Sequence, residues 1–334
     1  MFCVEFLNYI IADVFINNTK AQTCPRKPPL HQRSFEMNRN NINNQIQDLV
    51  KVNHAEIFDV SFPFYHYTGI EGINGILGDN NFYVSQSDFL NDRTEIAHFQ
   101  KIYENAISVL TNGRPFDNDV RLFMSYCKIF SEYLKVKNHS FVENDSLYVL
   151  SFTSNNDHLP LWSSYTSNTG YNIGFNNNLN KYFENKGMKF WVGNVIYDED
   201  RQYEIIADGL SEASKIWSQA DNLGISDQIT EEINKKLFDK FQLYSMFLKN
   251  HLFDSEEEVR IVFKKRDSDK MFHRCSNGIF IPYIKVNFRK ECVRSVCVGP
   301  INNLDNAQIG LKSFLNNNGY REMKINKSKI PLRY

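Results

Sequence analysis

Segments with the pattern of β-strands cluster on both sides of one long helical stretch, and this arrangement restricts the fold more than any other feature. Apolar or alternating runs such as "FPFYHYT", "NFYVSQS" and "SLYVLSFTS" precede the helical stretch, and "FIPYIKVNF" and "VRSVCVGP" follow it. Residues 199–251 carry an apolar stripe with charged flanks. A doubly wound parallel sheet needs strands and helices that alternate strictly. The sequence therefore predicts an α+β fold with a mostly antiparallel sheet and a helical insertion near residues 199–251.

The first 55 residues differ in character from the rest of the chain. A proline-rich and charged segment, "CPRKPPLHQR", interrupts them, and Met37 opens "MNRNNINNQIQDLVKV", which is typical of the start of a soluble domain. We interpret residues 1–36 as a flexible extension or as the result of a mis-assigned start, with Met1 and Met37 as alternatives. The predicted organisation is an N-terminal extension over residues 1–55 and a single α+β domain over 56–334.

Charge and cysteine usage narrow the classes of partner. The formal net charge is −1, so no overall basic field favours nucleic acid or an anionic membrane, although a local basic patch remains open. The six cysteines are scattered without a CxxC pair, which argues against a structural zinc site and against a disulfide framework. No apolar run is long enough to span a bilayer. These observations predict a cytoplasmic protein that does not enter the membrane.

The first candidate site lies in "YHYT" and "FYVS", two strand-like segments joined by a short helical segment. In an extended segment, His66 and Thr68 project to one face and Tyr67 projects to the other. Tyr83 and Ser85 share a face of the second segment. Because the short helix brings the two strands side by side, these side chains are expected to line one cleft. The alternative is that His66 is a hydrogen-bonded, half-buried core histidine.

The polar segment "LNDRTE", residues 90–95, is best explained by structure. Asp92 and Glu95 fit the start signal of a helix, in which side-chain oxygens accept hydrogen bonds from free backbone amides. Arg93 is either a phosphate ligand or a solvated surface residue.

An aromatic and hydroxyl-rich block covers residues 151–175. Trp162, Tyr165 and Tyr171 frame "NNDHLPLWSSYTSNTG", which we expect to be a loop. Aromatic rings beside small polar groups suit the stacking of a flat heterocycle, and they suit a large aromatic core equally well. Neither a G-x-G-x-x-G turn nor a Walker A lysine motif is present.

The last candidate is "EEEVRI". In a strand, Glu256 and Glu258 lie on one face and Arg260 continues the row. Two adjacent carboxylates repel, so each is expected to raise the proton affinity of the other. Such carboxylates can stabilise positive charge on a sugar carbon or accept a proton. An exposed, charged edge strand is the alternative.

Taken together, these blocks resemble a mainly bacterial family, domain of unknown function 2971. The resemblance rests on "YHYTGIEGINGIL", "FYVSQSDFLNDRTE", "LSFTSNNDHLPLWSSYTSNTGYNIGF" and "EEEVRI" in this order, and it runs from about residue 62 to the C-terminus. The family name implies no activity.

A looser resemblance does imply an activity. "YHYTGIEGINGILGDNNFYVS" resembles the opening of ADP-ribosyltransferase folds, whose split-sheet core carries an H-Y-E or R-S-E pattern on three strands. By this resemblance His66 takes the first position, Tyr83 or Ser85 the second, and Glu258 the third. His66 would hold the adenosine-side ribose of NAD, Tyr83 would stack on nicotinamide, and Glu258 would orient the nicotinamide ribose. NAD would be a substrate. The remaining residues expected to contact it are Tyr67, through its backbone, Thr68, Ser85, Trp162, Tyr165, Glu256 and Arg260.

Three functional hypotheses follow, and whether the protein is an enzyme stays open among them. The first is an NAD-consuming ADP-ribosyltransferase-like protein, acting as a bacterial toxin or antiphage defence effector on a protein, nucleic-acid or water acceptor. The second is a non-catalytic module that senses a nucleotide or binds a protein partner. The third is a metal-dependent hydrolase or nuclease with Mg²⁺ held by Asp92, Glu95, Glu256 and Glu258.

Overall fold

The computed structural model describes residues 30–52, 55–90, 95–111, 118–137, 147–276, 278–302 and 304–332. The chain divides into two compact units, Met1–Asn44 and Gln45–Tyr334. In the first unit the described residues belong to helix α2 (Leu30–Asp48). Residues 1–29, on which much of the predicted extension falls, lie outside the described residues. The following paragraphs concern the second unit.

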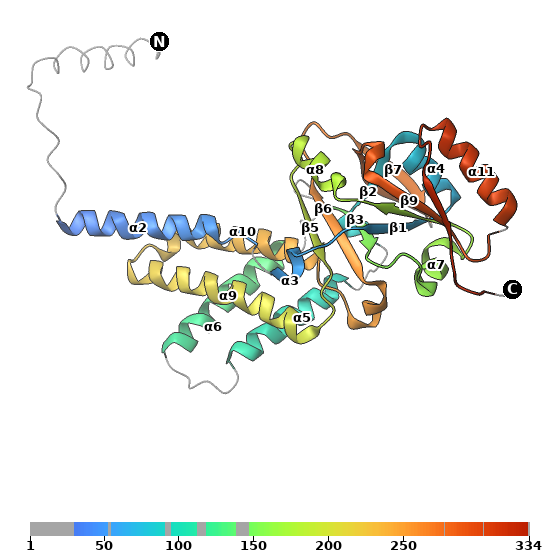
Figure 1. Cartoon of the computed structure of the whole chain (residues 1–334). Helices are drawn as coiled ribbons and strands as arrows, with labels where there is room; N and C mark the ends of the chain where they lie inside the picture. Colours follow the sequence, from blue (N-terminus) through green and yellow to red (C-terminus); the bar gives the residue numbers. More distant parts are fainter. Residues whose placement is uncertain are drawn as a thin grey trace, which may run out of the picture. The chain divides into compact units, whose positions relative to one another are not determined.

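The second unit is built on one sheet of ten described strands (Figure 1). Their order is β10-β9-β4-β1-β3-β2-β8-β7, and β6 pairs with both β3 and β5. All described pairings are antiparallel except that of β9 with β10. The prediction of an α+β fold with a mostly antiparallel sheet is therefore confirmed. The strands are β1 (Phe64–Thr68), β2 (Asn81–Gln86), β3 (Leu147–Thr153), β4 (Tyr171–Phe175), β5 (Phe190–Asn194), β6 (Glu258–Lys264), β7 (Met271–Ser276), β8 (Ile279–Asn287), β9 (Val293–Val298) and β10 (Lys324–Lys327).

The sheet splits at strand β3. Strand β6 pairs with β3 along the full length of one edge. The other edge is shared, because Thr153 near its end pairs with Tyr65 of β1, whereas Val149 nearer its start pairs with Ser85 of β2. One branch then continues through β4, β9 and β10, and the other through β8 and β7. As a result β1 and β6 lie on opposite sides of the same strand.

The main core lies between the sheet and three helices. Ile73, Ile76 and Leu77 of α4 (Ile70–Asp79) are buried in it, as their i, i+3, i+4 spacing predicts. The same core takes apolar residues from α8 (Asn178–Asn185) and α11 (Leu304–Asn317). Burial of each large side chain contributes about 1.5–3 kcal/mol. The phenylalanines at its centre are Phe64, Phe82, Phe152, Phe175 and Phe288.

The predicted helical insertion consists of α9 (Glu199–Asn222) and α10 (Ser226–Ser245). These helices pack against α5 (Glu95–Thr111) and α6 (Asn118–Lys137), which come from the region before β3 (Figure 1). Trp217 and Tyr126 contact each other across α9 and α6, and Phe130 contacts Phe241. The helices at 199–251 thus form one layer with earlier helices. The short helices α3 (Ala55–Phe58) and η1 (Ser87–Phe89) contact strands β5 and β3 of the sheet.

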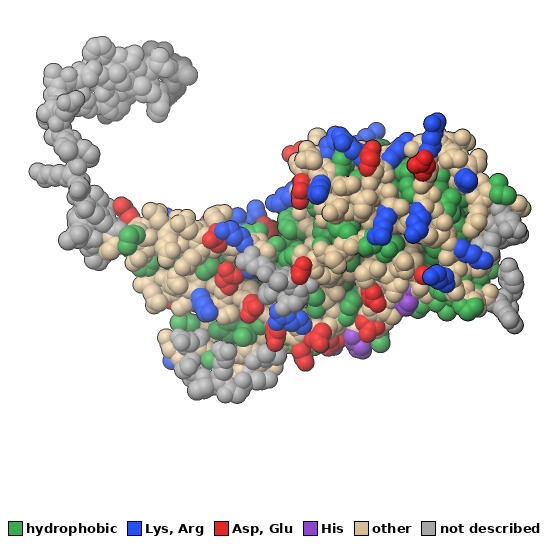
Figure 2. Space-filling model, viewed as in Figure 1, with side chains coloured by type: hydrophobic (Ala, Val, Ile, Leu, Met, Phe, Trp, Pro, Cys, Tyr) green, Lys and Arg blue, Asp and Glu red, His purple; other side chains and the backbone are tan. Residues whose placement is uncertain are grey.

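Two segments differ from the sequence expectation. The expected loop between β3 and β4 contains helix α7 (Leu159–Thr166), with Pro160 in its first turn. The stretch "MFHRCS", which had no predicted structure, forms β7. On the face of the molecule seen in Figure 2, side chains of both charge signs are exposed, and the formal net charge of the chain is −1. Among the described helices none is long and apolar enough to cross a membrane.

The side chain of Gln202 joins the helical layer to the segment that follows α10. Its amide nitrogen donates hydrogen bonds to the carbonyl oxygens of Ile196 (2.6 Å) and Lys249 (2.8 Å), and its oxygen lies 2.7 Å from Nε2 of His98. Gln202 is fully buried. Gln202→Leu should therefore lower the free energy of unfolding by about 1–3 kcal/mol, because it leaves the Lys249 carbonyl and the His98 ring without this partner and removes one of the two donors to the Ile196 carbonyl.

Urea denaturation would measure this effect, with Gln219→Leu as the matched control. Gln219 lies on the same helix but is exposed. We expect the control to change stability by less than about 0.5 kcal/mol. Equal effects of the two substitutions would show that the Gln202 hydrogen bonds do not stabilise the contact between the helical layer and the segment that follows α10.

Candidate functional site

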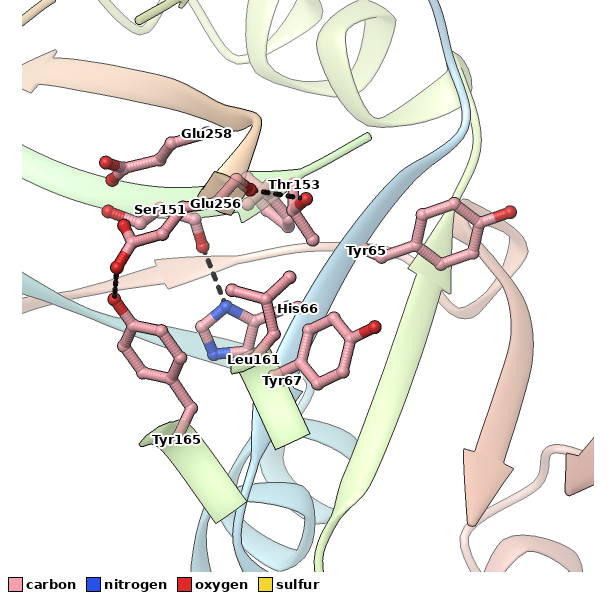
Figure 3. A pocket seen from close by; sticks show the side chains of 10 residues that line it. Tyr65, His66, Tyr67, Ser151, Thr153, Leu161, Tyr165, Glu256 and Glu258 are labelled. Atoms are coloured by element: carbon pink, nitrogen blue, oxygen red, sulfur yellow. Dashed lines mark hydrogen bonds between the residues drawn. The ribbon is translucent and has the colours of Figure 1, made fainter. Parts of the chain in front are cut away.

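A pocket lies where β1, β3, α7 and the start of β6 meet (Figure 3). Its volume is about 70 Å³, which is room for several water molecules. The pocket is open on one side, so a larger ligand would extend from it across the surface. It is lined by Tyr65, His66, Tyr67, Ser151, Phe152, Thr153, Leu161, Tyr165, Glu256 and Glu258.

Strand pairing explains why residues so distant in sequence meet here. Thr153 of β3 pairs with Tyr65 on one side and with Glu258 on the other. The Thr153 hydroxyl also donates a hydrogen bond to the Glu256 carbonyl oxygen (2.8 Å), which fixes the segment before β6. Glu257 has φ of +44°, in the left-handed region, and separates the short helix η2 (His251–Glu256) from β6.

His66 is half-buried and oriented by the backbone of β3. Its Nδ1 lies 2.9 Å from the Ser151 carbonyl oxygen, and its ring meets the Phe152 ring edge-on at 5.8 Å. Burial lowers the pKa of His66, and the hydrogen bond to Ser151 offsets part of this shift. At neutral pH the ring is therefore uncharged. Because a carbonyl oxygen only accepts, the proton lies on Nδ1, and Nε2 presents a lone pair as a hydrogen-bond acceptor.

Glu258 is a buried carboxylate held by two cations. Nε and Nη2 of Arg260 donate to its two oxygens at 2.8 and 3.0 Å, and Nζ of Lys249 donates to Oε2 at 3.1 Å. Burial alone would raise the pKa of Glu258, but Arg260 and then Lys249 outweigh it and lower the pKa to about 2. The expectation that the neighbouring carboxylate would raise its proton affinity is wrong, because the cations dominate.

Glu256 is the more accessible of the two carboxylates. Its side chain is 17% exposed, against 8% for Glu258. Lys249 donates to Oε2 (2.6 Å) and the Tyr165 hydroxyl to Oε1 (3.1 Å). The expectation that Glu256 and Glu258 alternate along one strand is wrong, because Glu256 is the last residue of η2 and lies outside β6. The left-handed Glu257 nevertheless brings both carboxylates to Lys249.

Tyr165 and Trp162, both on α7, have different positions. Tyr165 is 43% exposed, and its hydroxyl faces Glu256 at the pocket (Figure 3). Burial, with Glu256 next, raises the pKa of Tyr165, so its hydroxyl stays protonated and donates. Trp162 is fully buried, 4.7 Å from the Tyr67 ring, and donates from Nε1 to Asp157 (2.8 Å). The sequence left two interpretations of this block open, a core of aromatic residues or a stacking site for a heterocycle. Trp162 fits the first, because it is buried, and Tyr165 fits the second, because its ring is exposed.

The pocket brings together five of the predicted residues, namely His66, Tyr67, Tyr165, Glu256 and Glu258. Tyr83 does not line the pocket. Its hydroxyl donates to Asp79 (2.9 Å), and its ring lies 5.4 Å from that of Tyr283. Ser85 accepts a hydrogen bond from Arg274 (3.0 Å). Thr68 ends β1 outside the lining, and Arg260 lies behind Glu258.

Sequence reasoning missed Ser151, Thr153 and Lys249. Alternation along "SLYVLSFTS" places Ser151 and Thr153 on one face of β3 and was the available signal. No sequence pattern indicated Lys249, because its position depends on the long-range parallel bridge between Ile196 and Leu248. Arg93 and Asp92, and the side chain of Glu95, lie outside the described residues. Within the described part of the chain no three His, Cys, Asp or Glu side chains are grouped to hold a metal ion.

Comparison with models of protein families gives a match to part of the chain. Residues 161–261 match the family model described as "Protein of unknown function (DUF2971)". The matched range includes Tyr165, Lys249 and both pocket carboxylates, whereas His66 lies outside it. A search of curated proteins and a search of solved structures each gave no match. The match supports the resemblance to that family for the blocks within residues 161–261, and the blocks at residues 65–95 lie outside it.

Proposed function

We propose that this protein is an NAD-consuming transferase of the ADP-ribosyltransferase type. One observation carries the proposal, namely that His66 on β1, Glu256 at the end of η2 and Glu258 at the start of β6 line one pocket. The H-Y-E or R-S-E pattern of the resemblance is carried on three strands. Here β1, β3 and β6 are direct neighbours at a split in the sheet, which supports the same arrangement.

For the middle position the geometry favours Ser151 over Tyr83. Strand β3, and not β2, lies between β1 and β6. Ser151 lines the pocket, its carbonyl orients His66, and its side chain hydrogen-bonds to Glu258. A serine in the middle corresponds to the R-S-E variant of the pattern. The proposed set is therefore His66, Ser151 and the carboxylate pair Glu256 and Glu258.

The residues present fit the chemistry that this class requires. Cleavage between nicotinamide and ribose develops positive charge on the ribose carbon, and the ADP-ribose group passes to an acceptor nucleophile or to water. Glu256 is placed at the pocket to stabilise that charge, with Tyr165 and Lys249 fixing its two oxygens. Nε2 of His66 can accept a hydrogen bond from a ribose hydroxyl. The exposed face of Tyr165 offers a stacking surface beside the pocket.

Release of nicotinamide from NAD by the purified full chain tests the proposal. We expect measurable release by the wild type and a rate about 10²-fold lower for Glu256→Gln, since one well-placed electrostatic group is removed. His66→Gln, which cannot reproduce the imidazole acceptor geometry, should also be impaired. Glu184→Gln is the matched control, because Glu184 is exposed on α8, and it should release nicotinamide at the wild-type rate. Absence of release by the folded wild type, or equal release by all variants, would refute the transferase.

A nucleotide-sensing module is the second candidate, and the ion pairing of Glu258 favours it. Both oxygens of Glu258 are engaged by Arg260 and Lys249, so the carboxylate that the resemblance assigns to catalysis is held in ion pairs. Glu256 is the more accessible of the two, although its oxygens also accept from Lys249 and Tyr165. This candidate predicts that NAD raises the melting temperature without turnover, by an amount that depends on its concentration. Stabilisation together with nicotinamide release would favour the transferase instead.

A further inference from the structure

A second surface lies on the branch of the sheet formed by β2, β8 and β7, none of whose residues lines the pocket. Tyr83 of β2 pairs directly with Lys285 of β8, and Tyr283 of β8 pairs with Phe272 of β7. Directly opposed residues of antiparallel strands project from the same face. Their chain neighbours Val84 and Ile284 are buried in the main core on the other face. Tyr83, Lys285, Tyr283 and Phe272 therefore lie together on the outer face of this branch.

Rings and cations alternate on this face. The Phe272 and Tyr283 rings are stacked with centroids 5.6 Å apart, and Tyr283 meets Tyr83 edge-on at 5.4 Å. Nζ of Lys285 lies 5.3 Å from the Tyr83 ring centre and 5.4 Å from that of Phe272. Nζ of Lys270 lies 5.3 Å from the centre of the same Phe272 ring. These residues, with Arg274, form what we call the aromatic–basic face.

The aromatic–basic face is accessible and carries an excess of positive charge. Its three rings are half-buried, and Lys270, Lys285 and Arg274 are exposed. Asp79 is a carboxylate in contact with the face, accepting from Tyr83 and lying 4.0 Å from Lys285. Among the described residues of the face and its contacts, three cations therefore accompany this carboxylate. Strand β7 ends its branch of the described sheet, and Lys and Arg side chains are visible on the sheet-bearing part of the molecule (Figure 2).

We propose that the aromatic–basic face binds single-stranded nucleic acid. Flat rings on a sheet surface provide stacking partners for unpaired bases, and the lysines and Arg274 lie where they can neutralise the phosphates that connect those bases. A duplex hides its bases, and an acidic peptide would use the cations but not the rings. The chemistry of the face therefore favours a single strand. This binding is independent of NAD turnover and stands whether or not the proposed activity is found.

Fluorescence anisotropy of the full chain with labelled, mixed-sequence DNA and RNA strands tests the proposal. Strands of about 20 nucleotides suffice, because comparable sites cover about 4–16 nucleotides. Phe272→Leu keeps an apolar side chain but removes the ring, and it should weaken binding by roughly 5- to 100-fold. Lys285→Gln should weaken binding and reduce the slope of log K against log salt by about 0.7. Lys215→Gln, an exposed lysine on α9, is the matched charge control and should bind as the wild type does.

Thermal melting of each variant confirms that it is folded before binding is compared. The proposal predicts that a duplex of the same sequence binds more weakly than the single strand, and that polyglutamate of equal charge competes poorly. No binding by the folded wild type would overturn it. So would equal binding by Phe272→Leu, Lys285→Gln and Lys215→Gln. Preference for the duplex, or equally effective competition by polyglutamate, would also overturn it, because either result shows attraction of negative charge without stacking of bases.

Discussion

We expect Arg260→Met to lower the free energy of unfolding by about 3–5 kcal/mol, the largest stability effect of any single substitution considered for this protein. Arg260 is 2% exposed and donates two hydrogen bonds to Glu258, which is itself buried. It also donates to the carbonyl oxygen of Met246 (2.7 Å), which it joins to β6. Methionine fills much of the same space but leaves the Glu258 carboxylate with Lys249 as its remaining cationic partner. Chemical denaturation at neutral pH would measure the loss.

Arg266→Met is the matched control for this prediction. Arg266 also makes hydrogen bonds through Nε and Nη2 to one carboxylate, that of Asp269, but its side chain is 45% exposed. An exposed pair of this kind contributes about 0–1 kcal/mol, so the control should be mild. Combining Arg260→Met with Glu258→Leu removes both charges, and the double variant should be more stable than Arg260→Met alone. Equal, small losses for Arg260→Met and Arg266→Met would contradict the view that burial makes the Glu258 pair structurally important.

Local patterns predicted much of the fold because they report which face of a segment is buried. The alternation in "FPFYHYT" and the spacing of Ile73, Ile76 and Leu77 correspond to β1 and α4. Helix α7 was not predicted, because its two serines and its threonine favour a loop locally. It is held by tertiary contacts that no local pattern contains, in particular the packing of Trp162 on Tyr67 and the hydrogen bond from Tyr165 to Glu256.

The candidate site was predictable only where it depended on residue type. His66 and the two carboxylates were identified from their chemistry, and the structure places them in one pocket. Tyr83 was assigned to that pocket because β2 follows β1 along the chain. In the sheet, however, β3 takes the place beside β1 and β6, and this order depends on pairings between residues about a hundred positions apart. Ser151 and Lys249 reach the site through the same long-range pairings and bridges, so sequence spacing could not reveal them.

Stability in acid should depend strongly on Glu258. Its pKa of about 2 in the folded protein lies below its ordinary value of 4.5, because Arg260 and Lys249 outweigh the opposing effect of burial. A lowered pKa means that the ionised carboxylate stabilises the native state. This contribution is fully present above about pH 4.5 and is lost as the pH falls from 4.5 towards 2. By linkage it amounts to about 3 kcal/mol.

Unfolding free energies measured between pH 7 and pH 2 for the wild type and Glu258→Gln would test this effect. We expect the wild type to lose stability steeply below pH 4.5 and the variant to lose less over the same range, so that the two curves converge in acid. His66 acts in an earlier window, at higher pH. Its lowered pKa means that protonating the half-buried ring costs stability as the pH falls below about 6.5. The Glu258→Gln variant retains that earlier loss, which separates the two groups. Glu184→Gln, which replaces an exposed glutamate, should follow the wild-type curve throughout. Parallel curves for the wild type and Glu258→Gln below pH 4.5 would show that the Glu258 ion pairs do not govern stability in acid.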